Sequence, residues 1–138
     1  MEHCTDVHLI VDELKEAGVP VAVGPSLSNR AKVEMENVTF RTPGVLASAG
    51  IDVAIFTDAP CTPIQYLPIC AGMAMREGMT EEDAFKALTI VPAKILKVDD
   101  RLGSLTVGKD ADVVVWNNHP MEIMGRPEMV FVSGKQIV

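Results

Sequence analysis

The sequence predicts an α/β fold in which parallel strands and helices are followed by a small separate β layer. Residues 53–60 read Val-Ala-Ile-Phe-Thr-Asp-Ala-Pro, a short apolar run typical of a strand that is buried on both faces. Upstream, strand, loop and helix patterns alternate as in a βαβ unit with parallel strands and a right-handed crossover. From Gly103 turn-forming residues dominate, so we expect a boundary near Arg101, between residues 1–100 and 101–138.

Apolar spacing and turn residues define the expected elements in the first half of the chain. Apolar residues at helical spacing predict the first helix, with Thr5 or Asp6 as its N-cap. A proline suits the first turn of a helix, so we expect Pro43 to begin the second one. The expected elements are a helix over 7–17 ended by Gly18, a strand over 19–23, a polar loop or lid over 28–39, a helix over 43–49 ended by Gly50 and a strand over 51–57. His3 would lie just ahead of the first helix, with no room for a strand before it.

The second half is expected to contain three helices and then three short β segments. Thr80 and Asp83 have the spacing of a capping box, with Asp83 in place of the usual Glu or Gln. Pro68 is expected to interrupt its helix, and Pro92 to open the last one. The expected elements are a helix over 64–76, a helix from 80 that buries Ala84, Phe85, Ala87 and Leu88, a helix over 93–96, a strand over 113–116 and a hairpin over 129–138 that turns at Ser133-Gly134.

Composition and charge exclude several classes of protein. The chain has 138 residues, of which 48% are hydrophobic and 22% charged, as in an ordinary soluble domain with a real core. A net charge of −7 without any Lys/Arg cluster predicts that nucleic acid is not a partner. The longest apolar stretch, residues 66–75, is too short to span a bilayer. Three cysteines without a CxxC spacing favour a reduced, cytoplasmic setting over a disulfide framework or a closed zinc knot.

Asp58 and His3 are the two residues that could carry chemistry. A carboxylate at the C-terminal end of a buried parallel strand lies where α/β folds place their active sites, and it can bind a metal or act as a general base. The structural alternative for Asp58 is a helix cap or a turn with Pro60. His3 can bind a metal through a neutral ring nitrogen, or it can be a solvated residue on a frayed end.

The other polar candidates are expected to have structural roles. His8 and His119 are interpreted as solvated surface residues, and Cys4 and Cys61 as thiols that serve packing. No base can be placed beside Cys4 by spacing, which argues against a nucleophile. Within the polar loop, three charged residues could contact a substrate, although a solvated face is the default interpretation. These are Arg30, Glu34 and Glu36.

Several motifs together resemble the metal-dependent amidohydrolase superfamily, with the imidazolonepropionase-like enzymes as the most similar subgroup. The strand end Ile55-Phe-Thr-Asp58 resembles the last barrel strand of that superfamily, and Glu2-His3-Cys4 resembles its Glu-His-Gly element at the end of barrel strand six. The specific part is the C-terminal signature. It comprises Thr89-Ile-Val-Pro-Ala-Lys-Ile-Leu96 and Asp100-Arg-Leu-Gly-Ser-Leu-Thr-Val-Gly-Lys-Asp-Ala-Asp-Val-Val-Val-Trp116.

The resemblance implies a fold and a set of roles. Residues 1–100 would form the C-terminal part of a (β/α)₈ barrel, and residues 101–138 the C-terminal strands of a small β-sandwich. Asp58 would bind the catalytic metal, Zn²⁺ or another divalent cation, and take a proton from the attacking water. His3 would bind a second metal or polarise the substrate. Residues 108–110 would form a structural turn.

The resemblance also implies an incomplete site. The superfamily's His-x-His pair, its strand-four Lys or Glu and its strand-five His have no counterpart here, which leaves at most two metal ligands. We therefore expect the C-terminal part of a hydrolase that acts on C–N bonds of a small molecule, with little or no activity as an isolated chain. The exposed edges of a partial barrel predict a homo-oligomer or pairing with an N-terminal portion. The alternative is a non-catalytic association module that docks with a partner supplying the missing strands.

Overall fold

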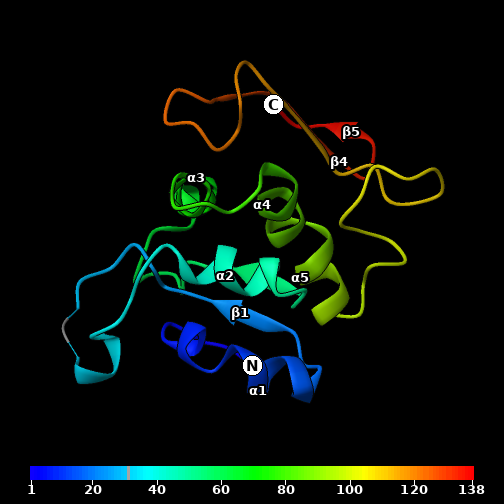
Figure 1. The fold of residues 1–138 in the computed structure, drawn as a ribbon. Coiled ribbons are helices and arrows are strands. Elements are labelled where there is room, and N and C mark those ends of the chain that lie inside the picture. Colours follow the sequence, from blue (N-terminus) through cyan, green and yellow to red (C-terminus); the bar gives the residue numbers. More distant parts are fainter. Residues whose placement is uncertain (31) are drawn as a thin grey trace.

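The computed structural model describes residues 1–30 and 32–138, and it shows a mixed α/β fold with two separate sheets (Figure 1). The first sheet consists of the parallel strands β1 (Val21–Val23) and β2 (Val53–Ile55). The second is antiparallel and has the order β3-β4-β5, with β3 (Val113–Trp116), β4 (Pro127–Val132) and β5 (Lys135–Gln136). The parallel pairing of β1 with β2 and the terminal hairpin are both as predicted.

The N-terminal segment runs beside β1, although it forms no regular strand. The Ala22 N–H donates to the Met1 carbonyl at 2.8 Å, and the Cys4 N–H donates to the Ala22 carbonyl at 3.3 Å. The protonated amino group of Met1 also donates to the Pro20 carbonyl at 3.0 Å. The residues ahead of the first helix are therefore held against the free side of β1, which the sequence did not predict.

The first helix differs from its prediction because the chain breaks at Ile10. A 3₁₀ helix, η1 (Val7–Leu9), precedes α1 (Val11–Ala17), and Ile10 between them has a φ of −132° and a ψ of 41°. The expected capping by Thr5 or Asp6 is wrong, since neither helix has a side-chain N-cap.

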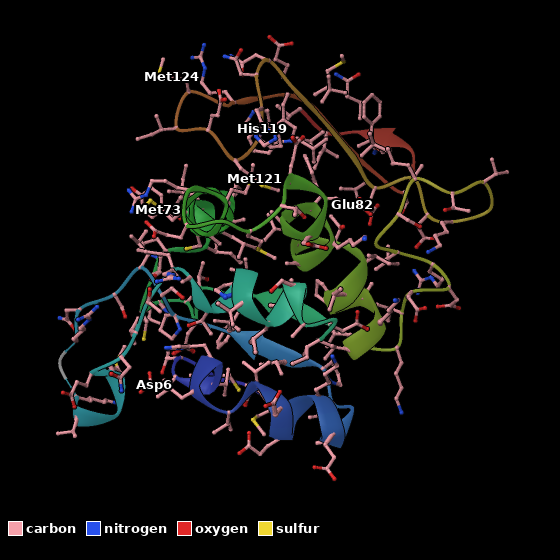
Figure 2. The ribbon with its side chains drawn as sticks, in the orientation of Figure 1. Asp6, Met73, Glu82, His119, Met121 and Met124 are labelled. Carbon is pink, nitrogen blue, oxygen red and sulfur yellow. The ribbon has the colours of Figure 1, made fainter. Side chains whose placement is uncertain are left out.

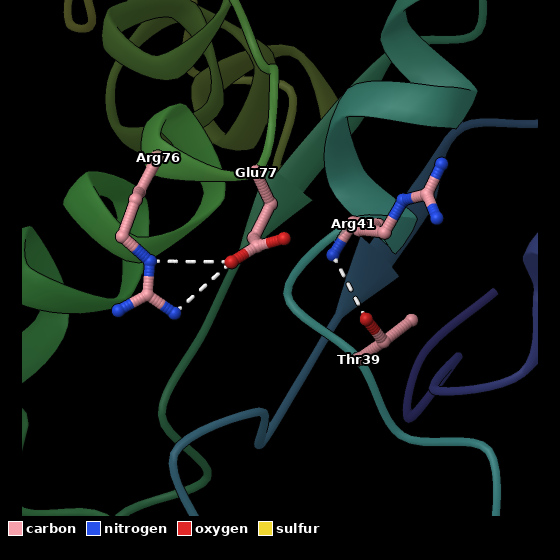
Figure 3. Close-up of polar contacts among 4 residues, drawn as sticks. All are labelled: Thr39, Arg41, Arg76 and Glu77. Carbon is pink, nitrogen blue, oxygen red and sulfur yellow. Dashed lines mark hydrogen bonds and ion pairs between the residues drawn. The ribbon is translucent and has the colours of Figure 1, made fainter.

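Helix α2 (Thr42–Ser48) connects the two parallel strands, and Pro43 stands in its first turn as predicted. Just before it, the Arg41 N–H donates to Thr39 Oγ1 at 3.3 Å (Figure 3). Gly18 and Gly50 follow α1 and α2 with positive φ values of 62° and 83°. Both helices stop there because such a backbone conformation is readily adopted only by glycine.

Three further helices follow β2, namely α3 (Leu67–Arg76), α4 (Glu81–Leu88) and α5 (Ile90–Ile95). Pro68 stands in the first turn of α3, after a 3₁₀ helix, η3 (Ile64–Tyr66). It therefore begins a helix and does not interrupt one, because the missing N–H of a proline costs nothing in a first turn. Helix α5 likewise starts ahead of Pro92 and not after it. At the end of α3, Arg76 pairs with Glu77 at 3.0 Å (Figure 3).

The capping of α4 is as predicted. Thr80 Oγ1 accepts a hydrogen bond from the Asp83 N–H at 3.1 Å and donates one to the Asp83 carboxylate at 2.6 Å. Of the expected buried face, Ala84 and Ala87 are buried. Phe85 is 37% exposed and was wrongly assigned to that face.

Two hydrophobic cores hold the α/β part together. The first lies around the parallel sheet, α1 and α2, and comprises Cys4, Val7, Leu14, Val21, Val23, Leu46, Ile51 and Val53. The second lies around β2, α3 and α4, and comprises Ile55, Cys70, Ala71, Ala74, Met79, Ala84, Ala87 and Met121. Met121 is the only contribution to either core from residues after 101, among the described buried residues.

The turn-rich segment between α5 and β3 is fixed by polar contacts. The Lys109 ammonium donates to the carbonyls of Asp99 and Leu102, and Arg101 pairs with Asp110 at 2.6 Å. These contacts are within the segment, in keeping with the structural turn expected at residues 108–110.

The faces of the parallel sheet are covered, while among the described residues β2 has a strand partner, β1, on one edge only. Every residue of β2 is buried, as are Val21 and Val23 of β1, because helices and the N-terminal segment cover both strands. Within residues 1–30 and 32–138, no helix has the length and apolar character needed to cross a bilayer.

Candidate functional site

A cavity of about 480 Å³ opens beyond the C-terminal end of β2, and both residues singled out in the sequence line it. Asp58 follows β2 directly after the buried Thr57. His3 reaches the same cavity because the N-terminal segment is hydrogen-bonded to β1, which pairs with β2. The lining residues are His3, Thr5, Gly24, Pro25, Ser28, Asn29, Lys32, Met35, Asp58 and Cys61.

His3 and Asp58 are in direct contact. Nε2 of His3 lies 3.2 Å from Oδ2 of Asp58, and the two side chains are 53% and 37% exposed. The His3 ring also meets the ring of Phe56 edge-on, with centroids 5.1 Å apart and an interplanar angle of 88°. An edge-to-face contact of this kind favours one ring orientation, so the imidazole is held with Nε2 toward the carboxylate.

Both residues adopt a left-handed backbone conformation, which is uncommon for residues other than glycine. The φ values are 56° for His3 and 52° for Asp58. Asp and His are among the residue types that tolerate this region best, although it still costs roughly 1 kcal/mol or more per residue. Such strain concentrates at functional sites, and here both residues of the His3–Asp58 contact have it.

Gly24, directly after β1, allows the backbone to pass close to the backbone of Phe56. A Cβ at this position would lie 2.1 Å from the Phe56 carbonyl oxygen. Only glycine therefore fits between β1 and the residue that carries the ring contacting His3.

Cys61 lies at the cavity and is exposed, so its assignment as a packing residue is wrong. Its N–H donates to the Asp58 carbonyl at 2.8 Å, which closes a tight turn after β2. A hydrogen bond to the Asp58 carboxylate raises the pKa of the Cys61 thiol. Cys4 and Cys70 are buried, and burial raises the pKa of each of these thiols.

The two other histidines are not the solvated surface residues that the sequence suggested. His8 is half-buried, and its Nδ1 lies 2.9 Å from the hydroxyl of the fully buried Thr42. His119 is also half-buried, and its Nδ1 accepts from the Met121 N–H at 3.2 Å. Its Nε2 is buried without a hydrogen bond, although Glu81 Oε1 lies 3.4 Å away. Neither histidine lines the cavity.

The polar loop over 28–39 forms one wall of the cavity. Arg30 does not point to a substrate position but donates to the Val38 carbonyl at 2.8 Å. Glu36 is exposed, while the side chain of Glu34 lies outside the described part of the chain. Lys32 and Asn29 line the cavity; sequence reasoning missed them, because the only signal was their place in a predicted lid.

His3 and Asp58 are two potential metal ligands, one imidazole nitrogen and one carboxylate oxygen. Among the residues that the structure describes, no group of three or more His, Cys, Asp or Glu side chains is arranged to hold a metal ion. The arrangement can therefore bind or release a proton and supply two donors to a cation.

Comparison with known proteins identifies one family over almost the whole chain. The model of the amidohydrolase family matches residues 1–137. An imidazolonepropionase of Maricaulis maris (strain MCS10) is 39% identical over 93 residues, covering 64% of this chain and 23% of that protein. The crystal structure of an amidohydrolase from Thermotoga maritima MSB8 has 41% sequence identity and a TM-score of 0.94, covering 99% of this chain and 36% of that chain.

A more distant solved structure shares the fold. An adenosine deaminase from Xanthomonas campestris with bound zinc has a TM-score of 0.71 at 20% identity, covering 98% of this chain and 36% of that chain. The chain therefore spans 23% to 36% of the length of these three proteins.

Proposed function

Because the chain belongs to the amidohydrolase family, we propose that it is the C-terminal part of a metal-dependent hydrolase that acts on C–N bonds. The bond would lie in an amide, a cyclic amide or an imine-type ring of a small molecule. The observation that carries this proposal is the contact of His3 Nε2 with Asp58 Oδ2, at 3.2 Å, in a cavity at the end of a parallel strand. Parallel α/β folds carry their chemistry at this end of the sheet.

The two donors fit part of a metal site. Zinc accepts imidazole nitrogen and carboxylate oxygen as ligands, and His3 and Asp58 offer one of each within reach of a single cation. The zinc bound to the Xanthomonas campestris adenosine deaminase, which shares the fold, supports zinc as the first candidate. An open catalytic zinc site normally has three protein ligands. We therefore propose that the remaining ligands come from a polypeptide that completes the site, and that the isolated chain binds the cation weakly and is inactive or nearly so.

The residues of this chain would have separate roles in hydrolysis. A bound divalent cation would supply Lewis acidity, which lowers the pKa of a water molecule to about 7. Asp58 would accept the proton of the attacking water and hold it for the leaving nitrogen, as a general base does. His3 would bind the cation or polarise the substrate carbonyl through Nε2, in an orientation stabilised by its contact with Phe56.

The finer architecture is part of the same proposal. We assign β1 and β2 to the end of a (β/α)₈ barrel, and β3, β4 and β5 to the C-terminal strands of a β-sandwich, with the division between residues 100 and 101. The parallel register of β1 with β2 and the separate antiparallel sheet support this assignment. The reduced, cytoplasmic setting that three cysteines without a CxxC spacing predict is part of the same proposal.

Zinc binding to the chain tests the proposal directly. Equilibrium dialysis with zinc should give an affinity that falls at least about tenfold on Asp58→Asn and on His3→Gln, since each removes a ligand. Asp52→Asn is a matched control, because Asp52 directly precedes β2 at the opposite end of the strand and is 56% exposed. His119→Gln controls for loss of a histidine away from the cavity. Unchanged affinity in both test variants would exclude the proposed ligands.

Activity tests the claim that the site is incomplete. The isolated chain, saturated with zinc, should hydrolyse N-acyl amino acids and cyclic amides no faster than its Asp58→Asn variant does. Robust metal-dependent hydrolysis that Asp58→Asn abolishes would show that this chain alone holds a complete site.

A further inference from the structure

We infer that Thr42 is a positioning residue for His3, and that its hydroxyl fixes the backbone turn from which the His3 ring reaches the cavity. The inference deepens the proposed function and rests on it in one respect, because it takes His3 as a metal ligand. The positioning itself can be measured without any metal, so the inference and the proposed function can fail separately.

The backbone that carries His3 is a tight turn. The Thr5 N–H donates to the His3 carbonyl at 3.0 Å, which closes a three-residue turn around Cys4. Cys4 is held from one side, because its side chain is buried in the first core and its N–H donates to the Ala22 carbonyl. His3 has a φ of 56°, an uncommon conformation that persists only where the surroundings enforce it. The contacts of Thr5, at the other end of the turn, therefore affect how the His3 ring is oriented.

Thr42 supplies the contact that holds Thr5. It is the first residue of α2, and it is fully buried, at 0% exposure. Its Oγ1 donates to the Thr5 carbonyl at 3.1 Å, although the two residues are 37 positions apart. A threonine hydroxyl at a helix start more often bonds to the backbone nearby. Among the described hydrogen bonds no side chain caps α2, so the Thr42 hydroxyl serves the distant turn and not its own helix.

His8 determines where the proton of the Thr42 hydroxyl lies. Nδ1 of His8 is 2.9 Å from Thr42 Oγ1. A hydroxyl has one proton to donate, and a carbonyl can only accept. Because the Thr42 proton is donated to the Thr5 carbonyl, His8 carries a proton on Nδ1 and donates it to Oγ1. The two bonds form a chain that is directed from His8 through Thr42 to the turn that carries His3.

A second contact joins the same segment to the polar loop over 28–39. Asn37 Nδ2 donates to Oδ2 of Asp6, the residue after Thr5, at 3.1 Å, and Figure 2 shows Asp6 beside that loop. This bond is exposed to water, whereas the Thr42 side chain is fully buried. Hydrogen bonds are stronger where water is excluded, so we assign the positioning to Thr42.

The tautomer of His8 tests the hydrogen-bond chain in the native protein, without any substitution. In mildly alkaline solution, where an ordinary imidazole is neutral, ¹H–¹⁵N correlation spectra should show the His8 proton on Nδ1. A proton on Nε2 would overturn the inference, because Nδ1 would then take the Thr42 proton and the Thr5 carbonyl would lose its donor.

Thr42→Val tests the consequence for His3, because valine has the shape of threonine without the hydroxyl. The native chain should show a nuclear Overhauser effect between the rings of His3 and Phe56, whose centroids are 5.1 Å apart. Thr42→Val should lose most of this effect, and Thr42→Ser, which keeps the hydroxyl, should retain it. An undiminished effect in folded Thr42→Val would overturn the inference. If Thr42→Val does not fold, the tautomer of His8 decides.

Thr62→Val is the matched control for lost stability. Thr62 is 2% exposed, and its Oγ1 donates to the Leu27 carbonyl at 2.7 Å, so this variant loses a comparable buried bond outside the turn at residues 3–5. Urea denaturation should show a similar loss of stability, while the effect between the two rings is retained. Loss of that effect in both variants would overturn the inference, since general destabilisation would then explain it.

Zinc affinity separates this inference from the proposed function. Thr42→Val should lower the affinity by no more than His3→Gln does, and it should cause no further loss in the His3→Gln background, because it acts through His3. An equal loss in both backgrounds would indicate a purely structural role and overturn the inference. If His3→Gln leaves the affinity unchanged, the proposed ligand is wrong, and the ring contact and the His8 tautomer still decide the positioning.

Discussion

The carbonyl oxygen of Met121 occupies the space in which a side chain at Gly72 would begin. A Cβ built on Gly72 would lie 2.3 Å from that oxygen. Gly72 belongs to α3, and Met121 belongs to the loop that leads toward β4. Helix α3 thus lies close against a distant backbone segment, where the α/β part meets the C-terminal part of the chain.

Gly72→Ala should therefore destabilise the protein, although alanine favours a helix interior by roughly 1 kcal/mol over glycine. The neighbouring group is a backbone carbonyl, which cannot rotate away, so the loop carrying Met121 must shift. We expect a net loss of about 1–3 kcal/mol in the free energy of unfolding, as for other overpacked sites. Urea denaturation measures it, with the exposed Arg76→Ala in the same helix as a near-neutral control. A stabilised Gly72→Ala variant would contradict the contact.

Leu46→Ala should destabilise the first core. Leu46 is fully buried, at 0% exposure, so the substitution leaves a cavity as well as removing apolar contacts. Buried Leu→Ala changes cost about 2–5 kcal/mol. Leu105→Ala is the matched control, since Leu105 is 84% exposed and the change should stay within about 0.5 kcal/mol. Similar losses for both variants would show that the two positions do not differ in burial.

Thr80→Ala should remove the N-cap of α4. The Thr80 hydroxyl accepts a hydrogen bond from the Asp83 N–H, and this donor has no partner within the helix. The expected loss is about 1 kcal/mol in the free energy of unfolding, and Thr80→Ser should restore most of it because serine caps equally well. If Thr80→Ser is as unstable as Thr80→Ala, the methyl group and not the cap is responsible.

The sequence predicted the elements that short-range rules determine. The Thr80 cap, the glycine after α1 and the turn at Ser133-Gly134 each depend on residues within a few positions of one another. The break at Ile10 was missed because the apolar spacing of residues 7–17 fits one continuous helix. In the structure, Val7 and Leu14 both enter the first core from separate helical segments.

The candidate site was predictable only in part, because its geometry depends on contacts between distant segments. Asp58 could be located at a strand end from the sequence alone. The approach of His3 could not, since it depends on hydrogen bonds between the N-terminal segment and Ala22. The same reason explains the errors on His8 and His119, whose neighbours Thr42 and Glu81 are far away in the sequence.

Thiol labelling tests the environment of Asp58 without relying on activity. Cys61 is exposed, whereas Cys4 and Cys70 are buried, so the first equivalent of a maleimide or disulfide reagent should react with Cys61. The thiolate is the reactive form. Because the hydrogen bond to the Asp58 carboxylate raises the pKa of Cys61, less thiolate is present at neutral pH than for an unperturbed thiol.

The labelling rate of Cys61 should therefore increase with pH and continue to rise above the usual pKa of a cysteine. Asp58→Asn removes the negative charge that stabilises the protonated thiol, so it should lower the pKa and speed up labelling at neutral pH. The measurement is made in the presence of a chelator, with Asp52→Asn as the control. Equal rates for the native chain and Asp58→Asn would mean that the Asp58 carboxylate does not interact with the thiol, and slower labelling of Asp58→Asn would reverse the sign of the effect.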